Sequence, residues 1–147
     1  MPTVESVCVD ASLYLSILMP DEHSPEALAK FEAWRTDDVD IIAPSVFVWE
    51  CLNALRQSVR RERLTDDEAL DLVGDLIALP VGIVPVEEAA GDVWSRFVVG
   101  LGLPSVYDAT YLAVADLEGC ELWTEDHRLY NTVHEHLPWV RCASLEA

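Results

Sequence analysis

Residues 105–126 read SVYDATYLAVADLEGCELWTED and contain, in order, a helical pattern, a glycine and a short apolar run. Gly119 ends the predicted helix, and the run that follows predicts a strand over 121–124. The remainder of the chain repeats this alternation. Short strand-like runs occupy 6–9, 40–43, 81–84 and 139–142, and helical patterns occupy 26–35, 45–63, 66–78, 87–99 and 126–134.

This alternation predicts an α/β fold, with a central, mainly parallel sheet of four to five short strands flanked by helices. The chain has 147 residues, of which 51% are hydrophobic. That length fits one domain over residues 1–147, and the apolar content is enough to close a core without disulfides or metal staples. Ligands of such sheets bind beyond the carboxyl ends of the strands. The polar residues that follow the strands are therefore the first candidates for a functional site.

The charge balance excludes one class of nucleic-acid binder. Acidic residues number 27 and basic residues 9, for a net charge of −18. A generic cationic coat for nucleic acid is excluded because phosphate would be repelled, whereas an enzyme that meets nucleic acid through bound metal ions is not. No apolar run approaches the roughly 20 residues of a membrane helix. The four scattered cysteines are expected to be reduced, which predicts a cytoplasmic protein.

Four carboxylates stand in unusual places. Asp10 and Asp126 follow predicted strands, while Glu50 and Asp108 lie in apolar helices. A buried carboxylate without a partner costs several kcal/mol, about 2–7 for a neutral polar group and more for a charge. Cations that could pair with all four are scarce, so a bound metal explains the set most economically. Oxygen ligands favour Mg²⁺ or Mn²⁺ over zinc.

Each of these acids has an ordinary explanation when it is taken alone. Asp10 fits a turn or a helix N-cap, and Asp126 fits the cap of the helix that follows it. Glu50 could pair with Arg56 or form a local hydrogen bond. The metal-site hypothesis therefore depends on the four residues occurring together.

The chain resembles the PIN domain, and more closely the small VapC-type toxin ribonucleases of toxin–antitoxin pairs. The segments that carry the resemblance are VCVDAS (7–12), VFVWECLNALRQ (46–57), LPSVYDATYLAVADLEG (103–119) and ELWTEDHRL (121–129). The resemblance implies a PIN-like three-layer fold. It also implies metal-dependent hydrolysis of RNA phosphodiesters, in which divalent ions held by carboxylates activate water and stabilise the leaving oxygen.

By position, the family's catalytic quartet falls on Asp10, Glu50, Asp108 and Asp126. The resemblance places the metal mainly on the three aspartates, with Glu50 close by or acting through water. Ser12 and Thr124 match the supporting polar positions of the family. A cognate antitoxin and a homodimer are also expected from the family. The −18 charge makes a basic, arginine-bearing antitoxin tail physically sensible.

Other charged residues have two interpretations each. Arg56, Arg60, Arg61 and Arg63 form a basic cluster that either contacts RNA or is a solvated helix end. Asp116, about 80° round the helix from Asp108, is considered as an outlying ligand for a second ion. Glu125 lies beside the quartet in sequence but matches none of its positions. The DH…HEH pattern of His127, His134 and His136 is a poor zinc template and is interpreted as an exposed polar face.

Three related folds fit less well. A haloacid-dehalogenase-like phosphatase needs a second Asp where this chain has Ser12, and also a late lysine. A receiver domain needs the same late lysine, which this chain lacks, and paired acids before its phosphorylated Asp. An RNase H-like nuclease would open with antiparallel hairpins, and the sequence has no two-residue hairpin turn. The serious alternative is a PIN-like domain that acts mainly as a binding or RNA-processing partner, with weak or no nuclease activity.

Overall fold

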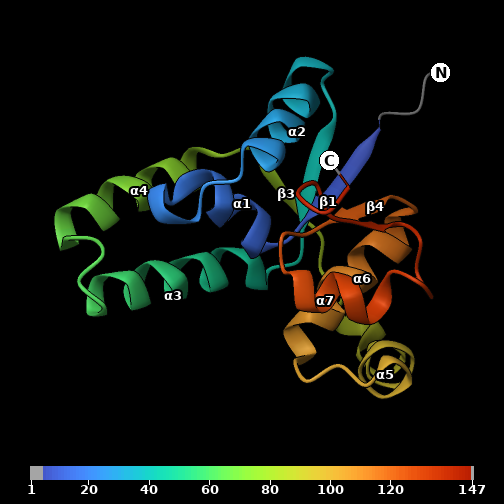
Figure 1. Cartoon of the computed structure of the whole chain (residues 1–147). Coiled ribbons are helices and arrows are strands. Elements are labelled where there is room, and N and C mark those ends of the chain that lie inside the picture. Colours follow the sequence, from blue (N-terminus) through green and yellow to red (C-terminus); the bar gives the residue numbers. More distant parts are fainter. Residues whose placement is uncertain (1–4, 147) are drawn as a thin grey trace.

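The computed structural model describes residues 5–146 and has a five-stranded sheet at its centre (Figure 1). Its strands are β1 (Ser6–Val9), β2 (Asp40–Ala43), β3 (Val81–Ile83), β4 (Glu121–Trp123) and β5 (Val140–Arg141). All neighbouring strands are parallel, in the order β3-β2-β1-β4-β5. The predicted α/β class with a parallel sheet is confirmed.

The first strand of the chain occupies the middle of the sheet. Val7 pairs with Ile41 of β2 on one side and with Glu121 of β4 on the other. Val7, Cys8 and Val9 are all buried, as expected of a parallel strand covered on both faces. Chain direction in β1 therefore brings the residue after it, Asp10, to the middle of the sheet's carboxyl edge.

Helices cover the two faces of the sheet and complete the three layers. One side holds α1 (Ala11–Leu18), α2 (Pro25–Thr36), α3 (Val46–Arg60) and α4 (Asp66–Ala78), and the other holds α5 (Ala90–Asp92), α6 (Val106–Glu118) and α7 (His127–Val133) (Figure 1). Three further segments are η1 (Pro20–Glu22), η2 (Glu87–Ala89) and η3 (Val93–Val99). Helices α3 and α4 form a hairpin that extends away from the sheet, whereas α6 packs on β1 and β4.

Most predicted boundaries agree with the structure to within three residues. The capping box at Thr65 is present, since its side chain accepts from the Glu68 N–H and Glu68 accepts from the Thr65 N–H. The single helix expected over 87–99 is instead a 3₁₀ turn, a short α-helical turn and a π-helical segment. Helix α1 was not predicted from the sequence, because its residues, ASLYLSIL, are largely apolar and show little polar alternation.

The structure also bears on the expected state of the cysteines and on the expected lack of a membrane helix. The four cysteines are free, and Cys8, Cys51 and Cys142 are buried. Within residues 5–146, no helix is both long enough and apolar enough to cross a membrane.

Candidate metal-binding active site

Asp10 is fixed at the point where β1 becomes α1. It is the N-cap of α1, and its Oδ1 accepts hydrogen bonds from the Leu13 N–H at 3.0 Å and the Ser12 hydroxyl at 2.6 Å. Only 5% of the residue is exposed. The carboxylate is therefore held by the start of its own helix, and its orientation at the sheet edge is set by local chain geometry.

Two hydroxyl groups connect Asp10 to the segment after β4. The Thr124 hydroxyl donates to Asp10 Oδ2 at 2.5 Å and lies 3.1 Å from the Ser12 hydroxyl. The Ser12 oxygen accepts from the Glu125 N–H, and the Thr124 oxygen accepts from the Asp126 N–H, both at 3.0 Å. This network ties the ends of the two central strands together and positions Asp126 beside Asp10.

Asp126 has the same local role in the second strand connection. It is the N-cap of α7, and its Oδ1 accepts from the backbone N–H groups of Arg128 at 3.1 Å and Leu129 at 3.2 Å. The ordinary explanation of Asp10 and Asp126 as helix caps is therefore correct for both residues. Capping is compatible with a role at the sheet edge, because the two caps lie at the carboxyl ends of the neighbouring strands β1 and β4.

Electrostatic coupling links the four acids. Burial, and then the charge of Asp126, raise the pKa of Asp10 to about 7, against hydrogen bonds from Ser12, Thr124 and Leu13 that lower it. Burial is also the main reason that the pKa of Asp108 rises to about 6, with further contributions from Asp126 and Glu50. The structure thus brings together all four residues of the predicted quartet.

Glu50 has an oxygen with no partner. Burial raises the pKa of the Glu50 carboxyl, and the nearby Tyr111 hydroxyl opposes this shift. The two groups do not reach hydrogen-bond geometry, and within residues 5–146 neither Glu50 Oε1 nor the Tyr111 hydroxyl has any partner. A buried oxygen of this kind is costly unless another group satisfies it.

The quartet also lacks a paired cation. None of the ion pairs among residues 5–146 includes one of its carboxylates. The Arg128 charge lowers the pKa of Asp108 without pairing with it, and both residues line a small hollow beside α7. The pairing of Glu50 with Arg56, considered from the sequence, is not observed.

The donor chemistry fits a hard divalent cation. Within residues 5–146, the four carboxylates share a site with one orphaned oxygen and form no ion pair. Every side-chain donor is oxygen, as Mg²⁺ and Mn²⁺ prefer. No three of the four bring their oxygens within 4.8 Å of one another. This spacing suits an ion that keeps part of its water shell, as Mg²⁺ usually does in proteins.

Other predicted residues lie farther from the quartet. Arg56, Arg60, Arg61 and Arg63 are exposed on the outer part of the α3–α4 hairpin, and Arg63 pairs with Asp21 at 3.5 Å. With a rise of 1.5 Å per residue, Arg60 lies about 15 Å along the helix from Glu50. Asp116 accepts from Arg96 at 2.9 Å and lines a hollow with Glu5 and Ser6, at the opposite edge of the sheet.

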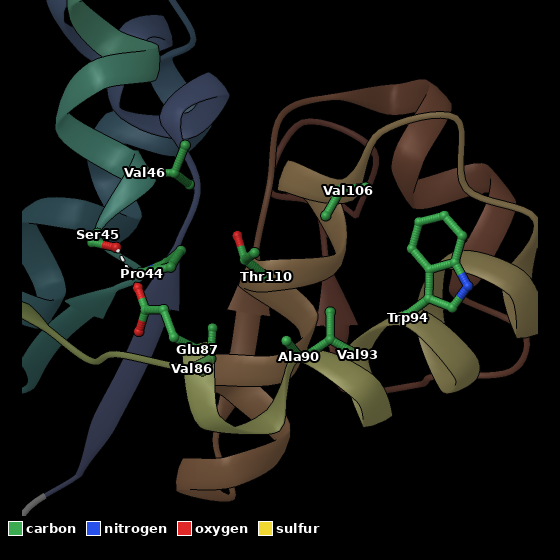
Figure 2. A pocket seen from close by; sticks show the side chains of 10 residues that line it. All are labelled: Pro44, Ser45, Val46, Val86, Glu87, Ala90, Val93, Trp94, Val106 and Thr110. Carbon is green, nitrogen blue, oxygen red and sulfur yellow. Dashed lines mark hydrogen bonds between the residues drawn. The ribbon is translucent and has the colours of Figure 1, made fainter.

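An apolar cleft adjoins the quartet without containing any of its members. It has a volume of about 350 Å³ and lies between the start of α3, the segment after β3, and α6 (Figure 2). Its lining residues are Pro44, Ser45, Val46, Val86, Glu87, Ala90, Val93, Trp94, Val106 and Thr110. Ser45 donates to Glu87 at 3.3 Å. Val46 lies four residues before Glu50, on the same face of α3, so the cleft begins one helical turn from the acid.

Two residues of the site were missed in the sequence. Arg128 follows Asp126 within DHRL and is the cation whose charge acts on Asp108. Tyr111 is almost fully buried, and its hydroxyl faces Glu50. Arg128 could have been found from its place in the motif. Tyr111 could not, since a tyrosine among apolar residues of a helix most often belongs to the core.

Known structures share this fold. Similar structures include PAE2754 from Pyrobaculum aerophilum, with TM-score 0.65, 23% identity, and coverage of 97% of this chain and 92% of that one. VapBC2 from Rickettsia felis, bound to a DNA fragment from its promoter, has TM-score 0.65, 11% identity and coverages of 93% and 96%. VapC20 of Mycobacterium tuberculosis, a sarcin-ricin loop cleaving toxin, has TM-score 0.61, 15% identity and coverages of 86% and 95%.

Comparison at the level of sequence gives the family. No curated protein sequence matches the chain. The family model of the PIN domain matches residues 7–135, which include all four residues of the quartet. This match covers most of the chain, and the parallel sheet with acids at its carboxyl edge agrees with it. The chain belongs to the PIN domain family.

Proposed function

We propose that this protein is a divalent-metal-dependent endoribonuclease and the toxin of a type II toxin–antitoxin pair. The observation that carries the proposal is the convergence of Asp10, Glu50, Asp108 and Asp126 at one sheet edge without a paired cation, on a chain of the PIN family. Nuclease activity is consistent with this family. Metal dependence is inferred from the chemistry of the site, and RNA as substrate from the resemblance to VapC-type toxin ribonucleases.

Each residue would have a definite task. Asp10, Asp108 and Asp126 would hold Mg²⁺ or Mn²⁺, with Glu50 close by or acting through water. When bound, the ion would polarise the phosphate and make an attacking water more acidic. Ser12 and Thr124 hold Asp10 through hydrogen bonds that favour its ionised form. Arg128, beside Asp108, would contact a phosphate of the strand, and the arginines of the α3–α4 hairpin would contact RNA farther out.

The proposed partner is an antitoxin with a basic tail. Toxin–antitoxin complexes are among the similar structures, one of them from Klebsiella pneumoniae. Arginine side chains of the tail would pair with the quartet, because arginine binds carboxylates bidentately. The apolar cleft one turn from Glu50 would accept an apolar side chain of the same segment. We also propose a homodimer, since Trp49 and Ile77 on the α3–α4 hairpin are 70% and 74% exposed. The free cysteines fit a cytoplasmic location.

The first experiment is a calorimetric titration of Mn²⁺ into the metal-stripped protein. Wild type is compared with Asp108→Asn, and Asp71→Asn is the matched control because Asp71 is an exposed acid on α4. Saturable binding that is lost in Asp108→Asn and kept in Asp71→Asn would support the site. Equal binding by all three proteins would mean that the acidic surface collects the ion, and the binding-partner function would then be favoured.

Two further measurements separate the parts of the proposal. Structured RNAs incubated with Mn²⁺ should be cleaved by wild type and by Asp71→Asn but not by Asp108→Asn. Inducible expression should arrest the growth of a bacterial host only when the quartet is intact. Cleavage without growth arrest would overturn the toxin role and leave the nuclease role standing.

A further inference from the structure

Glu125, His127 and Cys142 bring three kinds of metal donor together beside the quartet. One ligand atom from each lies within 4.8 Å of the other two. The Cys142 Sγ is 3.7 Å from Glu125 Oε1, and His127 Nε2 is 4.0 Å from Glu125 Oε2. Bonds of about 2.0–2.3 Å in a tetrahedral zinc site put neighbouring ligand atoms about 3.3–3.8 Å apart. Small side-chain movements would therefore complete such a site.

We propose that these three residues form a Zn²⁺ site that is separate from the quartet. A sulfur, an imidazole nitrogen and a carboxylate oxygen are a donor set that zinc prefers and that Mg²⁺ does not. Within the described part of the chain, no other group of His, Cys, Asp and Glu residues has this spacing. The Cys142 thiol releases its proton to solvent when the ion binds.

The three proposed ligands differ in how far they lie from the surface. Cys142 is fully buried, the Glu125 side chain is 7% exposed, and the His127 side chain is 52% exposed. Both inner donors contact Ser144, since Glu125 Oε1 accepts from the Ser144 N–H at 3.2 Å and the Cys142 Sγ lies 3.5 Å from the Ser144 hydroxyl. The ring of His127 at the surface needs only to exchange its 2.8 Å contact with the Ser144 hydroxyl for the ion.

Solvent reaches the cluster through a hollow of about 520 Å³. Its wall includes Glu125, His127 and Ser144, together with Glu22 and His23. An ion can enter by this route, and a water molecule can occupy the fourth position. A three-residue zinc site with one open position is an arrangement that proteins use.

The position of the cluster gives the ion a mechanical role. Glu125 and His127 are the sequence neighbours of Asp126, and Cys142 directly follows β5. Zinc would join the loop after β4 to the chain segment after β5. The Glu125 N–H donates to Ser12, so the joined loop is the one that holds both Asp126 and the hydroxyl network of Asp10. The ion would therefore stabilise the segment that carries part of the quartet.

Cobalt substitution tests the site by a signal that the quartet cannot give. Co²⁺ is titrated into the metal-stripped full chain, and absorption is recorded in the near ultraviolet, where thiolate-to-cobalt charge transfer appears. We expect this band in wild type and in Asp108→Asn, at one equivalent of Co²⁺, and its displacement by Zn²⁺. Absence of the band from the wild-type protein would overturn the proposal, whatever the outcome for the nuclease.

Substitutions then assign the ligands. Cys142→Ser should abolish the band, while Cys120→Ser, which changes a cysteine outside the cluster, should keep it. His127→Ala, at a surface position where folding is not at risk, should weaken Zn²⁺ binding by roughly 100-fold, since even residues that only orient a ligand contribute 10- to 100-fold. His136→Ala is its control. A band that persists in Cys142→Ser, or unchanged zinc affinity in His127→Ala, would contradict the site.

Discussion

The hydroxyl of Thr124 donates a 2.5 Å hydrogen bond to Asp10 Oδ2, although 114 residues separate the two in sequence. This bond joins the carboxyl ends of β1 and β4, and it favours the ionised form of Asp10. Because β4 lies next to β1 in the sheet, Thr124 can reach Asp10 and lower its pKa.

Replacing Thr124 by valine tests the importance of this bond. Thr124→Val keeps the shape of the side chain and leaves Asp10 short of a donor. We expect the free energy of unfolding to fall by about 1–3 kcal/mol at pH 8, where Asp10 is ionised. Mn²⁺ affinity at pH 7 should fall as well, because the pKa of Asp10 rises further. Urea denaturation and calorimetry measure the two effects. The control is Thr36→Val at the exposed end of α2. An equal loss of stability in the control would contradict a specific contribution of the hydrogen bond between Thr124 and Asp10.

The stability of the metal-free protein should depend on pH in a specific direction. The pKa of Asp10 is raised by burial from 3.8 to about 7, and that of Asp108 to about 6. The unfolded chain releases these protons at lower pH than the folded chain does. Stability should therefore fall as pH rises from about 4 to about 7, and excess Mn²⁺ should reverse the loss at pH 7.

A matched variant separates the two titrations. Asp108→Asn should lose the part of the decline that runs from the ordinary aspartate pKa of 3.8 up to the raised pKa of Asp108, about 6, and keep the part due to Asp10, which continues to about 7. Thermal unfolding at a series of pH values, with a chelator present, gives the curves. Identical curves for wild type and variant would show that Asp108 does not carry a raised pKa.

Among the residues that the structure describes, the buried Tyr111 hydroxyl has no hydrogen-bond partner. Tyr111→Phe removes this hydroxyl and leaves the ring in the core. We expect the free energy of unfolding of the metal-free protein to stay the same or to rise by up to about 1 kcal/mol, since an unsatisfied polar group is removed. Urea denaturation measures the change. A loss of more than about 1 kcal/mol would mean that the hydroxyl has a stabilising partner, such as water or Glu50.

Arginines near and far from the quartet should differ in their effect on RNA. Arg128 lines a hollow with Asp108, whereas Arg61 is exposed beyond the end of α3. Arg128→Gln should slow RNA cleavage more than Arg61→Gln does. If its side chain contacts a phosphate, each substitution should reduce the slope of the logarithm of the RNA-binding constant against the logarithm of the salt concentration by about one. The converse order of effects on cleavage would place the scissile phosphate nearer the α3–α4 hairpin.

The sequence was enough to predict the strands, because they depend on local patterns, and those patterns also marked the four acids as unusual; their role as a metal-binding quartet stays a prediction. Four-residue apolar runs such as SVCV have little alternative to a buried strand, and a strand end followed by Asp is visible without coordinates. Helix α1 escaped prediction because ASLYLSIL is nearly uniform in hydropathy, so no period can be read from it. The π-helical backbone of η3 escaped for another reason, since no residue type specifies that geometry.

Contacts between residues far apart in the chain could not be predicted from the sequence. Cys142 meets Glu125 and His127 only because a strand of two residues, β5, pairs with β4. The sequence pattern grouped His127 with His134 and His136, whereas the structure places His127 near a cysteine 15 positions away. Contacts of this kind depend on strand register, which becomes known only with the fold.

The double role of Asp10, as a helix cap and as a member of the quartet, has an evolutionary consequence. Asparagine caps helices as well as aspartate does, but it carries no charge. If the proposed role holds, one base change from an Asp to an Asn codon at this position would silence the nuclease and leave α1, the sheet and the partner surface in place. A single mutation would then convert an active enzyme into an inactive protein that still binds the same partner.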